Sequence, residues 1–353
     1  MTVHSARPCP SVTPPFLESH SHQTVLLQEA VEALCIVPHG IYVDATFGRG
    51  GHSRRMLDAL GADGRVIAFD RDPEAVRIGK TIRDARFEII HAPFSELKTQ
   101  LAQRGVTQIQ GLLADLGVSS PQLDSAQRGF SFRLDGPLDM RMDPTRGIPV
   151  STWIAQATTD DLRKVISDYG EERFAVPIAN AITARCAAAQ RGEEEPLEST
   201  AALAQLVAET LRRRGARPEP GQHPATRTFQ ALRIYINHET EELAALLQAA
   251  VELVCESGRI AIISFHSLED RAVKQFFRQH AGKLTAERSR GVSRGQHALA
   301  KSFEGRSEGT MAAPAVRLVS RIRPSALEIA RNPRARSATL RVVERQSREG
   351  GSR

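Results

Sequence analysis

A glycine-rich turn and a later acidic residue stand at a spacing that suits a nucleotide-like ligand. The turn, Gly48-Arg49-Gly50-Gly51, follows an apolar run from Ile41 and precedes a helical pattern, and Asp70 comes twenty positions after Gly50. Glycine lets the backbone approach a ligand closely because it has no Cβ, and a carboxylate at this offset accepts hydrogen bonds from a ribose. The alternative interpretation is a structural tight turn with an incidental acid.

The elements around this turn predict an α/β fold. After the strand from Ile41, we expect strands at residues 65–70, 87–91 and 110–116, with helical segments between them. Ser95 is expected to cap the helical segment at 96–104. This alternation is typical of a parallel, doubly wound sheet, in which ligands bind at the carboxyl ends of the strands. Four residues fall at those predicted ends and are expected to share one site: Gly50, Asp70, Phe94 and Asp115.

After Asp115 a loop is expected at 117–124, and the pattern then changes from alternating strands and helices to helices alone. We expect an inserted all-helical domain at 125–222 and a sheet domain made of 22–124 and 223–353. Residues 1–21 carry prolines and serines without an apolar core, which predicts a flexible extension.

The sheet pattern resumes after the predicted insert. A long helix, straight or bent, is expected from Ala225 to Val251, and strands are expected at 259–266 and 338–344. The polar, unpatterned segment at 280–314 predicts a mobile loop.

The composition is that of an ordinary globular protein. The chain has 353 residues, a formal net charge of +6 and a pI near 9.4, which fits a polyanionic partner without requiring one. Four scattered cysteines favour a reducing cytoplasm and argue against a structural zinc, so no metal site is expected. No apolar run approaches the roughly 20 residues of a membrane-spanning helix, so no membrane association is expected.

Longer motifs carry a resemblance to a known family. In chain order they are residues 22–27, 47–53, 70–73, 115–124, 136–143, 223–233, 264–271 and 332–337. Together they closely resemble the bacterial 16S ribosomal RNA (cytosine-N4)-methyltransferases, the RsmH (MraW) family. The resemblance covers about residues 21–345 and leaves out the N-terminal extension.

This resemblance implies a fold, a cofactor and a substrate. The fold is a class I, Rossmann-like methyltransferase sheet with an inserted helical domain. The cofactor is S-adenosyl-L-methionine, and the substrate is the exocyclic N4 of a cytidine in the decoding region of 16S rRNA. The positions that match the family's cofactor contacts are Gly50, Gly51, His52, Asp70, Phe94, Asp115 and Gln122.

The reaction needs a group that accepts hydrogen bonds from the target amino group. The N4 lone pair of cytosine is delocalised into the ring, so the enzyme must align N4 with the methyl group and accept its protons. Candidate catalytic residues are Asp115, Ser119 and His266, and the choice among them is open. Candidate RNA-binding residues are Arg227, Arg233, Arg334 and Arg336.

Two departures from broader patterns keep other functions open. Thr46 stands where common class I loops have glycine, and residues 115–118 lack the Pro-Pro-aromatic motif of many amino methyltransferases. One alternative is a nicotinamide-dependent oxidoreductase. The absence of a glycine three positions after Gly50 counts against this alternative. Another is a noncatalytic ribosome-binding factor. The choice between free RNA and an assembled small subunit as substrate is open, as is the oligomeric state.

Overall fold

The structure is a computed structural model that describes residues 24–217, 221–282 and 315–347. The predicted extension at 1–21 and nearly all of the predicted loop at 280–314 lie outside these residues. The described part contains one seven-stranded sheet with the strand order β3-β2-β1-β4-β5-β7-β6. The strands are β1 (Ile41–Asp44), β2 (Arg65–Asp70), β3 (Phe87–His91), β4 (Ile109–Asp115), β5 (Val254–Ser264), β6 (Val316–Ile322) and β7 (Thr339–Arg345).

The predicted parallel sheet is confirmed for the first five strands. β1 pairs in parallel with β2 and β4, β2 pairs in parallel with β3, and β5 pairs in parallel with β4. β7 lies antiparallel between β5 and β6. Sequence reasoning missed β6, because only Val316 of its residues is buried and the others show no alternation of exposed and buried positions, so the apolar signal is weak.

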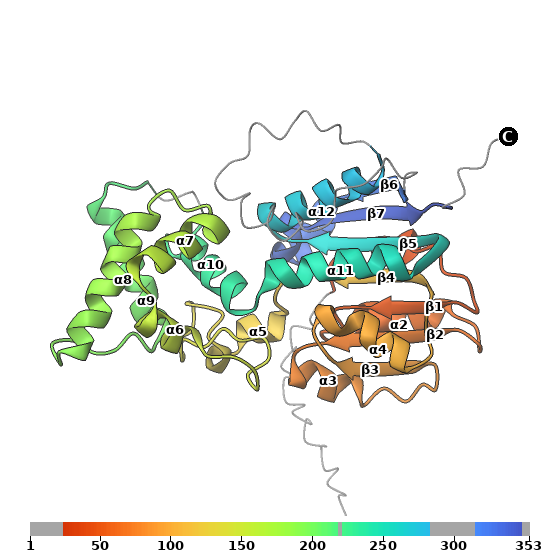
Figure 1. Cartoon of the computed structure of the whole chain (residues 1–353), viewed down its shortest axis with the longest axis horizontal. Coiled ribbons are helices and arrows are strands. Elements are labelled where there is room, and N and C mark those ends of the chain that lie inside the picture. Colours follow the sequence, from red (N-terminus) through yellow and green to blue (C-terminus); the bar gives the residue numbers. More distant parts are fainter. Residues whose placement is uncertain (1–23, 218–220, 283–314, 348–353) are drawn as a thin grey trace, which may run out of the picture.

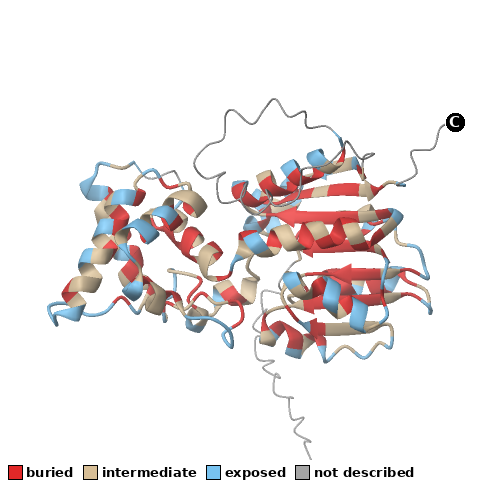
Figure 2. Ribbon diagram, in the orientation of Figure 1, coloured by how far each residue is buried: buried red, intermediate tan, exposed pale blue. Residues whose placement is uncertain are grey.

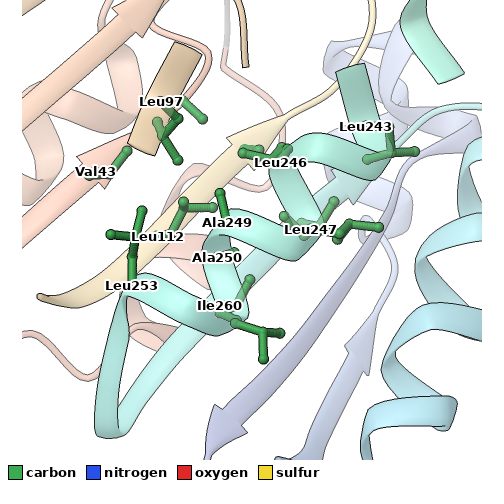
Figure 3. Close-up of a cluster of buried hydrophobic side chains, with 14 of the residues drawn as sticks. Val43, Leu97, Leu112, Leu243, Leu246, Leu247, Ala249, Ala250, Leu253 and Ile260 are labelled. Carbon is green, nitrogen blue, oxygen red and sulfur yellow. The ribbon is translucent and has the colours of Figure 1, made fainter. Parts of the chain in front are cut away.

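Helices cover both faces of this sheet. α4 (Leu97–Gln103), α11 (Glu239–Leu253) and α12 (Ser267–His280) pack on one face, where Leu246, Leu247 and Ala250 contact strand residues such as Leu112 and Ile260 (Figure 3). α1 (Leu27–Ala33) and α2 (Gly51–Ala59) pack on the other face. α3 (Pro73–Gly79) flanks β2 and β3, and α14 (Ala326–Arg331) precedes β7.

A second, helical region lies beyond the carboxyl ends of the strands (Figure 1). It contains α6 (Val150–Gln156), α7 (Thr159–Gly170), α8 (Ala175–Gln190) and α9 (Thr200–Arg213), all between β4 and β5 in the chain. These helices enclose a hydrophobic core of their own, and Figure 2 shows the buried residues of the two regions as separate groups. No helix of the described residues is long and apolar enough to cross a membrane.

The predicted long helix from Ala225 to Val251 is two helices. α10 (Thr226–Ile236) ends before His238, which has a left-handed φ of 51°, and α11 then begins. Phe229 and Leu232 of α10 pack in the core of the helical region. We therefore propose that the helical unit continues to Asn237, beyond the predicted boundary at residue 222.

Three local predictions were wrong. The segment 117–124 was expected as loop, but α5 (Ser120–Asp124) forms there with a capping box between Ser119 and Gln122. Ser95 was expected to cap a helix, but its hydroxyl and backbone N–H both donate to Glu242 of α11 instead. The fifth strand was expected to begin at residue 259, but β5 begins at Val254 with a bulge near its start.

Candidate active site

A cavity of about 360 Å³ opens at the carboxyl ends of the parallel strands. Of the residues singled out from the sequence, those that line it are Gly51, His52, Asp70, Phe94, Asp115, Ser119, Gln122, Arg233 and Arg334. The expected convergence of the strand ends is therefore present. Four of the predicted residues do not line this cavity: Gly50, Arg227, His266 and Arg336.

The glycine turn brings the start of α2 to the cavity wall. Gly50 precedes the helix with a φ of 79°, a conformation that side chains disfavour. A Cβ on Gly51 would lie 1.9 Å from the Thr24 hydroxyl oxygen, so only glycine fits there. The first N–H groups of a helix carry a partial positive charge, which suits a bound carboxylate.

Asp70, at the end of β2, presents a carboxylate to the cavity. Its two oxygens accept the backbone N–H groups of Gly48 and Asp72, each at 2.8 Å. Each oxygen keeps a second acceptor position, so the carboxylate can still receive two hydroxyl donors. Burial raises the pKa of Asp70 to about 6 against the lowering effect of those two N–H donors.

Asp115, at the end of β4, carries an unsatisfied carboxylate. Its Oδ1 is buried and has no hydrogen-bond partner in the described part of the chain. Burial, reinforced by the nearby carboxylates of Asp44 and Glu269, raises the pKa of Asp115 well above its ordinary value. An unpartnered carboxylate in a cavity wall favours a ligand that brings a positive charge or an N–H donor.

Thr46 has a role that explains the departure from the common glycine. Its hydroxyl oxygen accepts the backbone N–H of Asp115 at 2.6 Å, and its own N–H donates to Asp44 at 3.1 Å. The threonine therefore ties the end of β1 to the end of β4 across the cavity floor.

Gln122 lines the cavity, but its amide is already engaged. Its oxygen accepts the Ser119 N–H at 2.8 Å, and its nitrogen donates to buried Asp72 at 2.8 Å. The same Asp72 oxygen accepts from Arg128 at 2.8 Å. Gln122 thus fixes the loop after β4 against the loop after β2.

Phe94 forms part of the cavity wall beside Ala92 and Pro93. The 3-10 turn that carries it, Phe94–Glu96, is held to α11 by the two hydrogen bonds between Ser95 and Glu242. A flat aromatic ring held in this way can pack against a purine base.

A partly buried charge cluster that was not predicted as a unit lies at the β5 end of the cavity. Arg233 pairs with Glu239 through two hydrogen bonds of 2.8 and 2.9 Å. His266 Nε2 lies 3.0 Å from Glu269 Oε1, and Arg233, Glu239 and Glu269 all line the cavity. Glu269 lies in the motif 264–271 but was not singled out as a site residue, and Glu239 lies outside every motif, so only their proximity in the fold marks the pair.

The hydrogen bonds of His266 leave it no lone pair for base catalysis. Its Nδ1 accepts the backbone N–H of Glu269 at 3.3 Å, so this network assigns the proton to Nε2, which faces Glu269 Oε1. We propose that His266 positions Glu269 and that it does not act as a base.

The other RNA-binding candidates fall in two places, the short helix Pro333–Ser337 and the helical region. Arg334 lines the cavity and pairs with Asp124 of α5. Arg336 is exposed in the short helix Pro333–Ser337. Arg227 lies in the helical region, where it donates to the Glu171 carbonyl at 3.0 Å.

The sheet topology and this cavity define a Rossmann-like, class I methyltransferase. The family model described as the MraW methylase family matches residues 19–346, and the chain belongs to that family. S-adenosyl-L-methionine is its methyl donor. The cavity wall offers groups that suit the parts of this molecule. They are a carboxylate for the ribose at Asp70, an aromatic ring for the adenine at Phe94, the N-terminus of α2 for the methionine carboxylate, and a carboxylate for a cationic group at Asp115.

Two curated relatives carry the name ribosomal RNA small subunit methyltransferase H. The protein of Ralstonia pickettii (strain 12J) is 51% identical over 324 residues, which is 92% of this chain and 97% of that one. The protein of Burkholderia pseudomallei (strain 1106a) is 50% identical with the same coverage. Among solved structures, a putative rRNA methylase from Clostridium thermocellum aligns with a TM-score of 0.41 and 12% identity, over 92% of this chain and 98% of that one.

Proposed function

We propose that this chain transfers a methyl group from S-adenosyl-L-methionine to N4 of a cytidine in the decoding region of 16S rRNA. The observation that carries the proposal is the 51% identity, over 92% of the chain, to a small-subunit rRNA methyltransferase. The cavity supports it because its walls suit that methyl donor.

Most of the predicted cofactor-binding residues are each assigned to one part of the methyl donor. We assign Gly51 and His52 to the methionine carboxylate, Asp70 to the ribose hydroxyls and Phe94 to adenine. Asp115 would accept from the amino group of the methionine portion, and Gln122 would hold the surrounding loops. Gly50 acts indirectly, because its left-handed φ turns the chain into α2.

Alignment is the main catalytic contribution of the protein in this proposal. The bound sulfonium supplies an already activated methyl group. The chain's own residues would hold the target base in line with it and keep the amino group facing acceptors such as Asp115 or Ser119. A base inside a folded RNA would have to leave its stack to enter the cavity.

The substrate context is part of the same proposal. The relatives are named for the small ribosomal subunit, and we infer that the assembled subunit is the partner. We infer that the enzyme works in the cytoplasm, where that subunit is used.

Methyl transfer to isolated small subunits tests the proposal. Subunits from cells that lack this gene are incubated with enzyme and labelled S-adenosyl-L-methionine, and the modified nucleotide is located by mass spectrometry. We expect one N4-methylcytidine in the decoding region. Binding to the subunit without transfer would favour a noncatalytic factor, and tight NAD binding without S-adenosyl-L-methionine binding would favour an oxidoreductase.

A further inference from the structure

Part of the cavity wall is not needed by the methyl donor. At the end of β5, beyond Asp115, the wall consists of Phe265, Glu269 and Arg233. None of these has a role in the cofactor assignments above. The register places Asp115 directly beside Ile263 of β5, so this wall continues from the place where the transfer would occur.

Glu269 presents a carboxylate that Phe265 and His266 hold in place. It is 7% exposed, its Oε2 accepts the Phe265 N–H at 3.1 Å, and its Oε1 receives the His266 Nε2 proton at 3.0 Å. Burial alone would raise the pKa of Glu269, but His266 and Arg233 hold it below the ordinary value. The side chain is therefore an ionised, fixed acceptor with further lone pairs for a ligand.

Arg233 presents donors beside this acceptor. Its Nε and Nη2 are taken up by Glu239, while its Nη1 makes no hydrogen bond within the described residues. Its Nη2 lies 3.5 Å from His266 Nε2, the atom that contacts Glu269, so guanidinium and carboxylate are neighbours. The side chain of Arg233 is 15% exposed, which leaves it access to the cavity.

Resting on the proposed function, we propose that Glu269 and Arg233 read the Watson–Crick edge of the target base and select cytosine over uracil. Cytosine carries an N4 amino donor next to an N3 acceptor, which complements a carboxylate next to a guanidinium. Phe265, in the same wall, offers a ring for stacking of an extruded base.

Uracil presents the opposite pattern and is rejected. Its O4 would place lone pairs against the Glu269 carboxylate, and its N3–H would face the Arg233 donors. The pair therefore acts before any chemistry, because a base without an amino group is not held.

The same cluster also resembles a cation site, because ligand atoms of Glu239, His266 and Glu269 lie within 4.8 Å of one another. The Arg233 guanidinium already donates two hydrogen bonds to the Glu239 carboxylate, and the proton on His266 Nε2 points to the Glu269 carboxylate. These contacts supply the positive charge that a metal would otherwise bring. Activity is accordingly expected to survive a chelator, and a strict metal requirement would contradict the proposal.

The test compares binding of two small-subunit preparations with S-adenosyl-L-homocysteine present. One carries cytidine at the methylated position, and the other carries uridine there. Wild-type enzyme is expected to bind the cytidine form about 10- to 100-fold more tightly. Glu269→Gln is expected to bring this ratio close to unity, because an amide can donate to O4 of uracil. The matched control is Glu256→Gln, which removes an exposed carboxylate in β5 and is expected to keep the wild-type ratio.

The ratio separates recognition from a purely structural role. If Glu269 only supported the fold, Glu269→Gln would weaken both forms equally, and an unchanged ratio would overturn the proposal. Cofactor calorimetry and thermal melting check the fold. If that variant does not fold, Glu269→Asp decides, because it withdraws the carboxylate by one methylene and should also lower the ratio. Wild-type enzyme that transfers no methyl group to cytidine would contradict the proposed function itself, whereas transfer without a cytidine preference would contradict only this inference.

Discussion

Three neighbouring strands end in aspartate, and the three side chains have different uses. Asp44 is fully buried, and its carboxylate accepts from the Ser53 hydroxyl and the Thr46 N–H. Asp70 is partly engaged by backbone donors, and Asp115 keeps a buried oxygen without a partner. Burial raises the pKa of all three. The first is thus structural, and the other two are available to a ligand.

The raised pKa of Asp70 predicts that cofactor binding depends on pH. Its ionised form accepts both ribose hydroxyls, so below a pKa of about 6 protons compete with the ligand. The affinity for S-adenosyl-L-methionine should therefore fall by up to about tenfold per pH unit in that range. Calorimetry from pH 5 to 8 measures this, and Asp70→Asn should bind weakly but lose the part of the fall centred near pH 6. An identical pH profile for both proteins would contradict the assignment.

Gly51→Ala should weaken cofactor binding without unfolding the chain. The new Cβ would lie 1.9 Å from the Thr24 hydroxyl oxygen, so the start of α2 must shift away from its position. We expect an affinity about 10- to 100-fold weaker by calorimetry, since small displacements at such a site are costly. Adding Thr24→Gly removes the obstructing atoms and should restore part of the binding. Full affinity in the single variant would rule out this view of the turn.

At the scale of elements, the junction of β1 and α2 depends on one buried hydrogen bond. Ser53 donates to Asp44 Oδ2 at 2.6 Å, and both residues are fully buried. Ser53→Ala should lower the free energy of unfolding by about 1–3 kcal/mol, because a buried acceptor loses its donor.

That loss should also depend on pH. The folded-state pKa of Asp44 is raised from 3.8 to about 6, so its contribution to stability is greatest at low pH and declines as pH rises through 6. Removing the Ser53 hydroxyl raises the pKa of Asp44 further. Urea titrations should therefore show that Ser53→Ala loses more unfolding free energy at pH 8 than at pH 5. The reverse order would contradict the assigned charge state.

Asn237 fastens the segment 139–143 to the end of α10 through its side chain. Its side chain receives the Met142 N–H at 2.7 Å and donates to the Met140 and Arg233 carbonyls, while its own carbonyl accepts from Arg71 at 2.7 Å. Asn237→Ala should cost about 2–5 kcal/mol of unfolding free energy and increase hydrogen exchange in residues 139–143.

A surface control separates this effect from simple amide loss. Gln248 of α11 bonds only to Glu252 among the described residues, so Gln248→Ala should cost less than about 0.5 kcal/mol. Equal losses of unfolding free energy in the two variants would show that the Asn237 side chain does not hold the segment 139–143 in place.

The strands whose apolar runs are short and bounded by turn residues were predictable. β2 and β3 have the expected bounds, and the fixed geometry of a parallel sheet then brought Asp70 and Asp115 to one edge. β6 and the division between α10 and α11 were not predictable, because they depend on tertiary packing and on a left-handed residue at His238. The Glu239 and Glu269 cluster was missed for the same reason.

At the scale of the whole molecule, two cores meet around one cavity that an RNA substrate must reach. The net charge of +6 predicts that binding to small subunits weakens with salt. Arg336→Gln should reduce the slope of log affinity against log salt by about 0.9, if it contacts a phosphate. Arg65→Gln, at the amino end of β2 and therefore away from the cavity, should leave the slope unchanged. Equal slopes in all three proteins would exclude Arg336 from the interface.

A crystal structure with S-adenosyl-L-homocysteine tests the central claim most directly. The account predicts the ribose hydroxyls at Asp70, adenine against Phe94, the carboxylate at the start of α2 and the amino group at Asp115. A ligand bound elsewhere, or one that leaves Asp70 and Asp115 without contact, would contradict it.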